Sequence, residues 1–214
     1  MIVSIVDYGS GNLRSVAKGF ERARSEAGLT MAIEITSSPA RVALADRVIL
    51  PGVGAFADCK RGLEAIPGLI DALKSVVCDS GRPFLGICVG MQLMAEQGLE
   101  NGATAGFGWV RGNVEMITSS EKRLKIPHMG WNELVFSEPR HPVLADLRPR
   151  EHSYFVHSYK MECKDDCDVV AWTDYGGPVT AAIGRENLFG TQFHPEKSQE
   201  VGLRLMKNFL SWRP

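Results

Sequence analysis

Hydrophobic and polar positions in the first half of the chain alternate between short apolar runs and longer amphipathic stretches. Ile2–Val6 and Pro83–Ile87 are continuous apolar runs, as expected for strands that are covered on both faces. From Leu13 to Phe20 the apolar residues recur at the spacing of one helix face. Further strands are expected at 31–36 and 47–50, and a further helix at 67–79. This alternation predicts a parallel sheet with helices on both faces.

The second half of the chain shows short strand-like runs separated by turn signals instead. The expected strands lie at 114–118, 133–136, 153–159, 169–173, 179–183 and 188–193. Their close spacing predicts antiparallel strands or hairpins, and the apolar stripe at 199–212 predicts a final helix with Ser198 at its N-cap. We therefore expect a single α/β domain over residues 1–214. It is a three-layer open sheet, parallel in the N-terminal half with antiparallel additions in the C-terminal half.

Composition and charge narrow the function classes. The 214 residues are 44% hydrophobic and 23% charged, which allows a sizeable core, and the net charge of −1 gives no support for a nucleic-acid partner. No apolar run approaches the roughly 20 residues that span a membrane. The five cysteines form no regular framework, so we expect a cytoplasmic protein. No cluster has metal-ligand spacing, and we expect neither metal nor cofactor.

The strongest chemical signal is the segment Gly86–Gly90, which has Cys88 at its centre. A small-x-nucleophile-x-small pattern between an apolar strand and a helix-like stretch at 91–96 is typical of a nucleophile elbow. The flanking glycines allow a tight turn that exposes the middle side chain. A thiol at a helix N-terminus is favoured as a thiolate. The alternative, a small buried cysteine, is common elsewhere but does not explain this context.

A base for Cys88 is expected far along the chain, at His194. Pro195 favours an extended backbone at the residue before it, and residues two apart in an extended segment point the same way. His194 and Glu196 are therefore expected to face one spot, with the carboxylate orienting the imidazole. The order Cys, His, acid is no objection, because such triads are defined by geometry.

Backbone N–H groups that could stabilise an oxyanion are expected in two places. Gly52, Val53 and Gly54 follow the strand expected at 47–50, and glycines let a backbone approach a ligand closely. Val89 comes directly after the nucleophile, and its N–H completes the expected oxyanion hole. A plain strand-to-helix turn remains the alternative for the two glycines.

Two motifs resemble those of the triad-type class I glutamine amidotransferase domain. They are Gly86–Gln92 and Phe193–Glu196, and they occur in the right order and at an appropriate separation. The resemblance covers essentially the whole chain and implies a flavodoxin-like sheet and glutamine hydrolysis by Cys88, His194 and Glu196. By the same resemblance, the residues expected to contact the substrate are Gln92, Glu100, Ser158 and Tyr159.

Further stretches resemble one branch of that family, the glutaminase subunits of imidazole glycerol phosphate synthases in histidine biosynthesis. These stretches are 7–12, 51–54, 127–132 and 154–159. The resemblance implies a heterodimer with a separate (β/α)₈-barrel synthase subunit. That subunit uses the ammonia on a phosphoribulosyl-formimino-aminoimidazole ribotide, which yields imidazole glycerol phosphate and an aminoimidazole carboxamide ribotide. The residues expected at its interface are Met129, Trp131, Asn132, Tyr154 and Lys197.

Three alternatives stay open from the sequence. An amidotransferase subunit of anthranilate or aminodeoxychorismate synthase would share the triad, although the stretches at 51–54 and 127–132 argue against it. A free-standing cysteine hydrolase on the same fold would turn over without a partner. Trp131 and Tyr154 could instead be core aromatics, because aromatic residues serve cores and interfaces alike.

Overall fold

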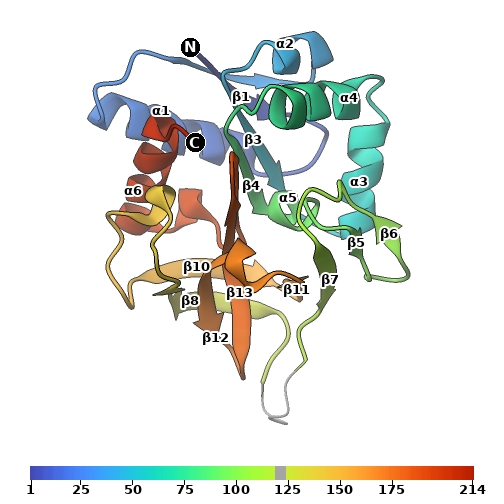
Figure 1. Ribbon diagram of the computed structural model, residues 1–214, viewed down its shortest axis with the longest axis vertical. Helices are drawn as coiled ribbons and strands as arrows, with labels where there is room; N and C mark the ends of the chain where they lie inside the picture. Colours follow the sequence, from blue (N-terminus) through green and yellow to red (C-terminus); the bar gives the residue numbers. More distant parts are fainter. Residues whose placement is uncertain (119–123) are drawn as a thin grey trace.

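The computed structural model describes residues 1–118 and 124–214. Its main feature is a large mixed sheet with helices on both faces (Figure 1). In sheet order its strands are β2 (Ala32–Thr36), β1 (Ile2–Val6), β3 (Arg47–Gly52), β4 (Phe84–Cys88), β14 (Leu188–Thr191), β13 (Pro178–Arg185), β12 (Val169–Asp174) and β9 (Val135–Phe136). The expected three-layer α/β architecture is confirmed.

Helices cover both faces of the parallel part of this sheet. They are α1 (Leu13–Glu26), α2 (Pro39–Ala43), α3 (Phe56–Glu64), α4 (Leu69–Lys74), α5 (Val89–Gln92) and α6 (Gln199–Ser211). Helices α1 and α6 pack together on one side, where the rings of Phe20 and Phe209 meet edge to face at 6.1 Å. Helices α2, α3 and α4 lie on the other side (Figure 1). None of the described helices is long and apolar enough to cross a membrane.

Burial explains why the central strands read as continuous apolar runs. Every residue of β3 and β4 is buried, as parallel strands between two helical layers must be. The helix expected at 67–79 is α4 followed by one π-helical turn, Ser75–Asp79.

Strand β14 departs from the expected division of the chain into parallel and antiparallel halves. It comes from the C-terminal half and yet pairs in parallel with β4, with Thr191 opposite Ile87. The five strands β2, β1, β3, β4 and β14 therefore run the same way, and only β13, β12 and β9 are antiparallel additions to this sheet. This placement carries the segment after β14 to the same edge as the end of β4.

The remaining strands form two smaller sheets beside the large one. A pair joins β8 (His128–Glu133) to β10 (His152–His157), and a second sheet has the order β11 (Tyr159–Cys163), β7 (Gly112–Met116), β5 (Gln97–Gly98) and β6 (Thr104–Ala105). Two expected strands are therefore divided. The run at 133–136 is split between β8 and β9, and the run at 153–159 between β10 and β11.

Candidate active site

Three adjacent parallel strands end at the candidate site. Gly52 at the end of β3 lies opposite Cys88 at the end of β4. Strand β14 lies on the other side of β4 and ends at Thr191. His194 follows shortly after this end, two residues beyond Gln192. Ligands bind at the carboxyl ends of strands in such sheets, and here the topology brings distant segments of the chain to one point.

The backbone around Cys88 forms a strained turn between β4 and α5. Cys88 has φ +55° and ψ −111°, a conformation that non-glycine residues rarely adopt. A Cβ atom at Gly90 would lie 1.8 Å from the Leu50 carbonyl oxygen, and one at Gly86 would lie 2.5 Å from the Gly90 carbonyl oxygen. Both glycines are therefore required by close backbone approach, as expected for a nucleophile elbow.

The helix after Cys88 is much shorter than the expected helix-like stretch at 91–96. Helix α5 ends at Gln92, because backbone N–H groups of a later segment take the carbonyls that a longer helix would use. Phe107 donates to Leu93 at 2.7 Å, and Trp109 donates to Met94 at 3.0 Å.

His194 and Glu196 form the expected pair, but the expected reason is wrong. The Nδ1 atom of His194 lies 2.9 Å from Oε1 of Glu196, and both side chains are almost completely buried. His194 itself is extended, as Pro195 predicts, whereas Pro195–Lys197 form one turn of 3₁₀ helix. The turn, rather than an extended strand, brings the carboxylate back to the imidazole.

The segment after His194 is anchored by Ser198. The Ser198 hydroxyl donates to the His194 carbonyl at 2.7 Å and accepts from the Tyr154 N–H at 3.0 Å. Ser198 occupies the N-cap position of α6, as expected. Its side chain makes no capping hydrogen bond, because the hydroxyl is used in the bonds to His194 and Tyr154. The backbone of His194 is thereby fixed to β10, since its N–H also donates to the Tyr154 carbonyl at 3.0 Å.

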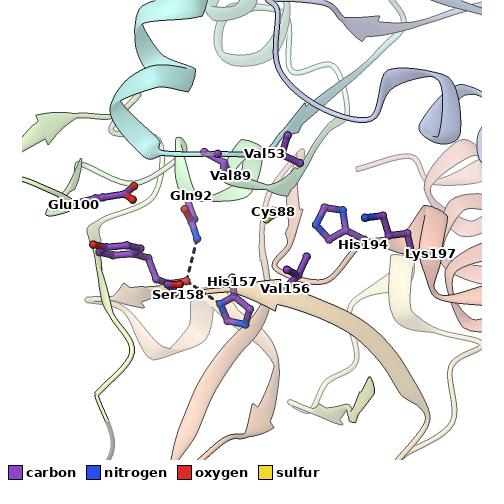
Figure 2. A pocket seen from close by; sticks show the side chains of 12 residues that line it. Val53, Cys88, Val89, Gln92, Glu100, Val156, His157, Ser158, His194 and Lys197 are labelled. Atoms are coloured by element: carbon purple, nitrogen blue, oxygen red, sulfur yellow. Dashed lines mark hydrogen bonds between the residues drawn. The ribbon is translucent and has the colours of Figure 1, made fainter. Parts of the chain in front are cut away.

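The imidazole of His194 is stabilised in its charged form. Burial lowers its pKa, but the adjacent Cys88 and Glu196 side chains favour the imidazolium more strongly, and together they raise the pKa of His194 to about 9. Its Nε2 atom is buried and has no hydrogen-bond partner among the described residues. Figure 2 shows Cys88 between Gln92 on one side and His194 on the other. This arrangement pairs a nucleophile with a proton donor.

A cavity of about 200 Å³ opens at Cys88, a size suited to a molecule smaller than a typical drug. It is lined by Val53, Gly54, Cys88, Val89, Gln92, Glu100, Val156, His157, Ser158, Tyr159, His194 and Lys197. All four residues expected to contact the substrate are among them. The Glu100 side chain also accepts from the Phe56 N–H at 2.8 Å, which fixes the carboxylate at the N-terminus of α3.

Gln192 is a site residue that the sequence reasoning missed. Its amide nitrogen lies 3.6 Å from the Cys88 sulfur, and its amide oxygen accepts from Gln92 at 2.9 Å. Gln192 comes two residues before His194, so the strand alternation that leads to His194 could have identified it.

The segment expected to form the oxyanion hole is held by the loop at 7–12. The Val53 N–H donates to the Ser10 hydroxyl at 3.0 Å, and the same hydroxyl donates to the Val53 carbonyl at 2.6 Å. The buried Tyr8 phenol donates to the Pro51 carbonyl at 2.8 Å, and burial raises the Tyr8 pKa far above its usual range. The sequence reasoning used this loop only as part of a resemblance and missed both contacts. Gly52 is packed too tightly for a side chain, because a Cβ atom would lie 2.7 Å from the Tyr8 hydroxyl.

Comparison with known proteins adds the family. The family model described as glutamine amidotransferase class-I matches residues 4–212. The chain belongs to the class I glutamine amidotransferase family.

Curated relatives of this amidotransferase are similar over its full length. It is 55% identical to the imidazole glycerol phosphate synthase subunit HisH of Brucella suis over 217 residues, with 100% of each chain covered. It is 56% identical to the protein of the same name from Rhodospirillum rubrum over 214 residues, again with 100% of each chain covered.

Solved structures agree on the fold of the amidotransferase. A glutamine amidotransferase crystal structure matches with a TM-score of 0.71 at 15% identity, covering 99% of this chain and 98% of that one. A second, from Thermotoga maritima, matches with a TM-score of 0.59 at 14% identity, covering 92% and 76%. At these identities the likeness shows the fold alone.

Most residues expected at a partner interface lie together on one face of the β8–β10 pair. Met129 and Trp131 are 66% and 47% exposed. Trp131 is paired with Tyr154 across the strands, with ring centroids 6.0 Å apart, and the Lys197 ammonium lies 5.6 Å from the Tyr154 ring centroid. Asn132 is not grouped with them. Its side chain turns to the other face of β8, where it contacts His128 and the Asp174 carbonyl.

Proposed function

We propose that this amidotransferase hydrolyses glutamine to glutamate and ammonia, and delivers the ammonia to a (β/α)₈-barrel synthase subunit. In the heterodimer that subunit makes imidazole glycerol phosphate and aminoimidazole carboxamide ribotide in histidine biosynthesis. The observation that carries the proposal is full-length identity of 55–56% to HisH subunits. Two further observations support it: Cys88 and His194 line one cavity, and His194 lies 2.9 Å from Glu196. We place the protein in the cytoplasm and treat residues 1–214 as one domain.

In the first half-reaction the Cys88 sulfur attacks the side-chain carbonyl carbon of glutamine, and a tetrahedral intermediate forms. His194, charged at neutral pH because its pKa is about 9, gives its proton to the amide nitrogen. The carbon–nitrogen bond then breaks, ammonia leaves, and a glutamyl thioester remains on Cys88. Glu196 orients the imidazole and stabilises its positive charge.

In the second half-reaction the neutral His194 takes a proton from water. The resulting hydroxide attacks the thioester carbonyl, and the Cys88 thiolate is released as glutamate forms. The imidazolium is thereby restored, so that one histidine serves as acid and then as base.

Substrate contacts follow from the cavity wall. The Glu100 carboxylate is suited to the α-ammonium of glutamine, and Ser158 and Tyr159 supply further polar groups to the cavity. Both N–H bonds of the Gln92 amide are used within the protein, one toward Tyr159 and one toward Gln192. Its oxygen is the group that accepts from the substrate.

The oxyanion hole is proposed to form only in the complex. The donors are the N–H groups of Val53, which lies between Gly52 and Gly54, and of Val89. The Val53 N–H is bonded to Ser10, so its peptide must turn before it can serve. Docking of the barrel subunit with its ribotide favours the turned state, which prevents wasteful hydrolysis of glutamine.

The docking surface is the exposed face formed by Met129, Trp131, Tyr154 and Lys197. Ammonia in neutral water is mostly ammonium, which is not a nucleophile. Delivery therefore requires direct docking and an internal path, and aromatic residues are the usual anchors of such interfaces.

The direct test is Cys88→Ser in the complex with the barrel subunit. We expect glutamine-dependent synthesis to be abolished, while synthesis from added ammonia stays within about two-fold of wild type. Loss of both activities would contradict the proposed division of labour, because the barrel subunit would then depend on Cys88 itself.

A further inference from the structure

A continuous series of hydrogen bonds runs from strand β8 to the glutamine cavity. On the inner face of the β8–β10 pair, His128 and His157 lie directly opposite each other, and Nδ1 of His128 is 3.0 Å from Nε2 of His157. Asn132 lies 3.2 Å from Nε2 of His128, and Nδ1 of His157 lies 2.8 Å from the Tyr159 carbonyl oxygen. The same oxygen accepts from the Gln92 amide at 3.1 Å, and Figure 2 shows the two bonds meeting there.

The Tyr159 carbonyl oxygen at the end of the series determines which nitrogen of each histidine ring carries a proton. A carbonyl oxygen can only accept, so Nδ1 of His157 must carry a proton. Burial lowers the pKa of His157 and of His128 to about 4, and both rings are neutral at neutral pH. Nε2 of His157 is then an acceptor, which requires a proton on Nδ1 of His128. Nε2 of His128 accepts in turn from Asn132.

The amide groups at the two ends of the series, Asn132 and Gln92, use their remaining N–H bonds within the protein. The Asn132 amide gives its second hydrogen to the Asp174 carbonyl at 2.9 Å, and its oxygen accepts from the Glu133 N–H at 2.8 Å. At the other end, the Gln92 nitrogen gives its second hydrogen to Gln192 at 2.9 Å. The orientation of the Gln92 amide is thereby decided, with its oxygen left for the cavity.

The backbone and the packing hold the two rings in this order. Gly130 lies between His128 and Asn132 in β8 and has φ +136°, a conformation that glycine adopts at no steric cost. The His128 ring is stacked between Tyr175, with centroids 3.9 Å apart, and Phe155, with centroids 4.7 Å apart.

We propose that His128 and His157 are positioning residues: as neutral rings with Nδ1 protonated, they link β8 to the Tyr159 carbonyl and so orient Gln92 toward glutamine. The kinetic part of this inference rests on the proposed function, because its substrate is glutamine. The tautomers do not depend on it. The opposite face of β8 carries Met129 and Trp131, so the series begins on the strand that is proposed to meet the partner.

The kinetic test uses the complex with the barrel subunit and the variants His157→Phe and His157→Asn. Phenylalanine removes the donor to Tyr159, and we expect the KM for glutamine to rise about five-fold with kcat changed by less than about two-fold. Asparagine places an amide N–H near the position of Nδ1, and we expect it to restore KM to within about two-fold. His152→Asn, on the exposed end of β10, is the matched control and should change neither constant.

The spectroscopic test is ¹⁵N NMR of the histidine rings in the isolated full chain at neutral pH. We expect His128 and His157 to be neutral rings with protonated Nδ1, and we expect His128→Phe to disturb the His157 signals. Protonation of His128 or His157 on Nε2 alone or on both nitrogens would overturn the inference. So would a fall in kcat with an unchanged KM in His157→Phe, or equal defects in both His157 variants. A wild-type complex without glutaminase activity would contradict the proposed function while leaving the predicted tautomers to stand or fall by NMR.

Discussion

The Ser10 hydroxyl makes two hydrogen bonds to the backbone of Val53, accepting from its N–H at 3.0 Å and donating to its carbonyl at 2.6 Å. The Cys59 thiol adds a weaker contact to the same carbonyl at 3.4 Å. One side chain thus holds the peptide whose N–H is proposed to stabilise the oxyanion. The resting orientation of Val53 is therefore stabilised by residues outside the glutamine cavity.

Replacing Ser10 by alanine should destabilise the resting orientation of Val53. Because two hydrogen bonds to Val53 are lost, we expect the glutaminase rate of the isolated chain to rise about ten-fold, and the factor of stimulation by the partner to fall accordingly. Steady-state glutaminase assays with and without the barrel subunit measure both. Ser25→Ala, on the exposed face of α1, is the control. An unchanged basal rate in Ser10→Ala would mean that Ser10 does not restrain the peptide.

Replacing Glu196 by glutamine should shift the pH dependence of turnover. The carboxylate favours the charged form of His194, whose pKa is about 9. Without that charge the pKa falls, so the proton needed by the leaving ammonia is lost at a lower pH. We expect the alkaline limb of the kcat profile of the complex to move down by about one to three pH units. A limb at the wild-type position would show that Glu196 does not tune His194.

Replacing Trp131 by alanine should weaken the heterodimer. Trp131 is 47% exposed beside Tyr154, and a buried aromatic anchor contributes about 2 kcal/mol or more to an interface, which is about a 30-fold change in Kd. Isothermal titration calorimetry with the barrel subunit measures the Kd. Trp172→Ala, at a 37% exposed tryptophan on β12, should leave the Kd unchanged. Equal losses in both variants would place the interface elsewhere.

Much of the site could be predicted because its parts are encoded locally. The tight turn at Cys88 requires small residues on either side of it. Both flanking glycines lie against backbone carbonyl oxygens that leave no room for a Cβ atom. The apolar runs of β1, β3 and β4 likewise indicate strands buried on both faces, because a strand that is covered on both faces needs apolar side chains on both.

Other parts depend on contacts between distant segments, which periodicity cannot reveal. Helix α5 ends early because the N–H groups of residues 106–110 bond the carbonyls of residues 93–96, and β14 is parallel because it pairs with β4. The contacts of Ser10 with Val53 and of Gln192 with Cys88 span 43 and 104 residues. The turn at Pro195–Lys197 shows the opposite case, in which a correct pairing was predicted from the wrong local conformation.

We propose that this amidotransferase hydrolyses glutamine under the control of a barrel subunit. The most direct measurement is the glutaminase rate of the purified chain, alone and with the cognate barrel subunit plus its ribotide substrate. We predict a low rate alone and a large rise in the ternary mixture, because the Val53 N–H is bonded to Ser10 in the isolated chain. A high rate alone that the partner leaves unchanged would contradict partner-gated catalysis and indicate a free-standing hydrolase.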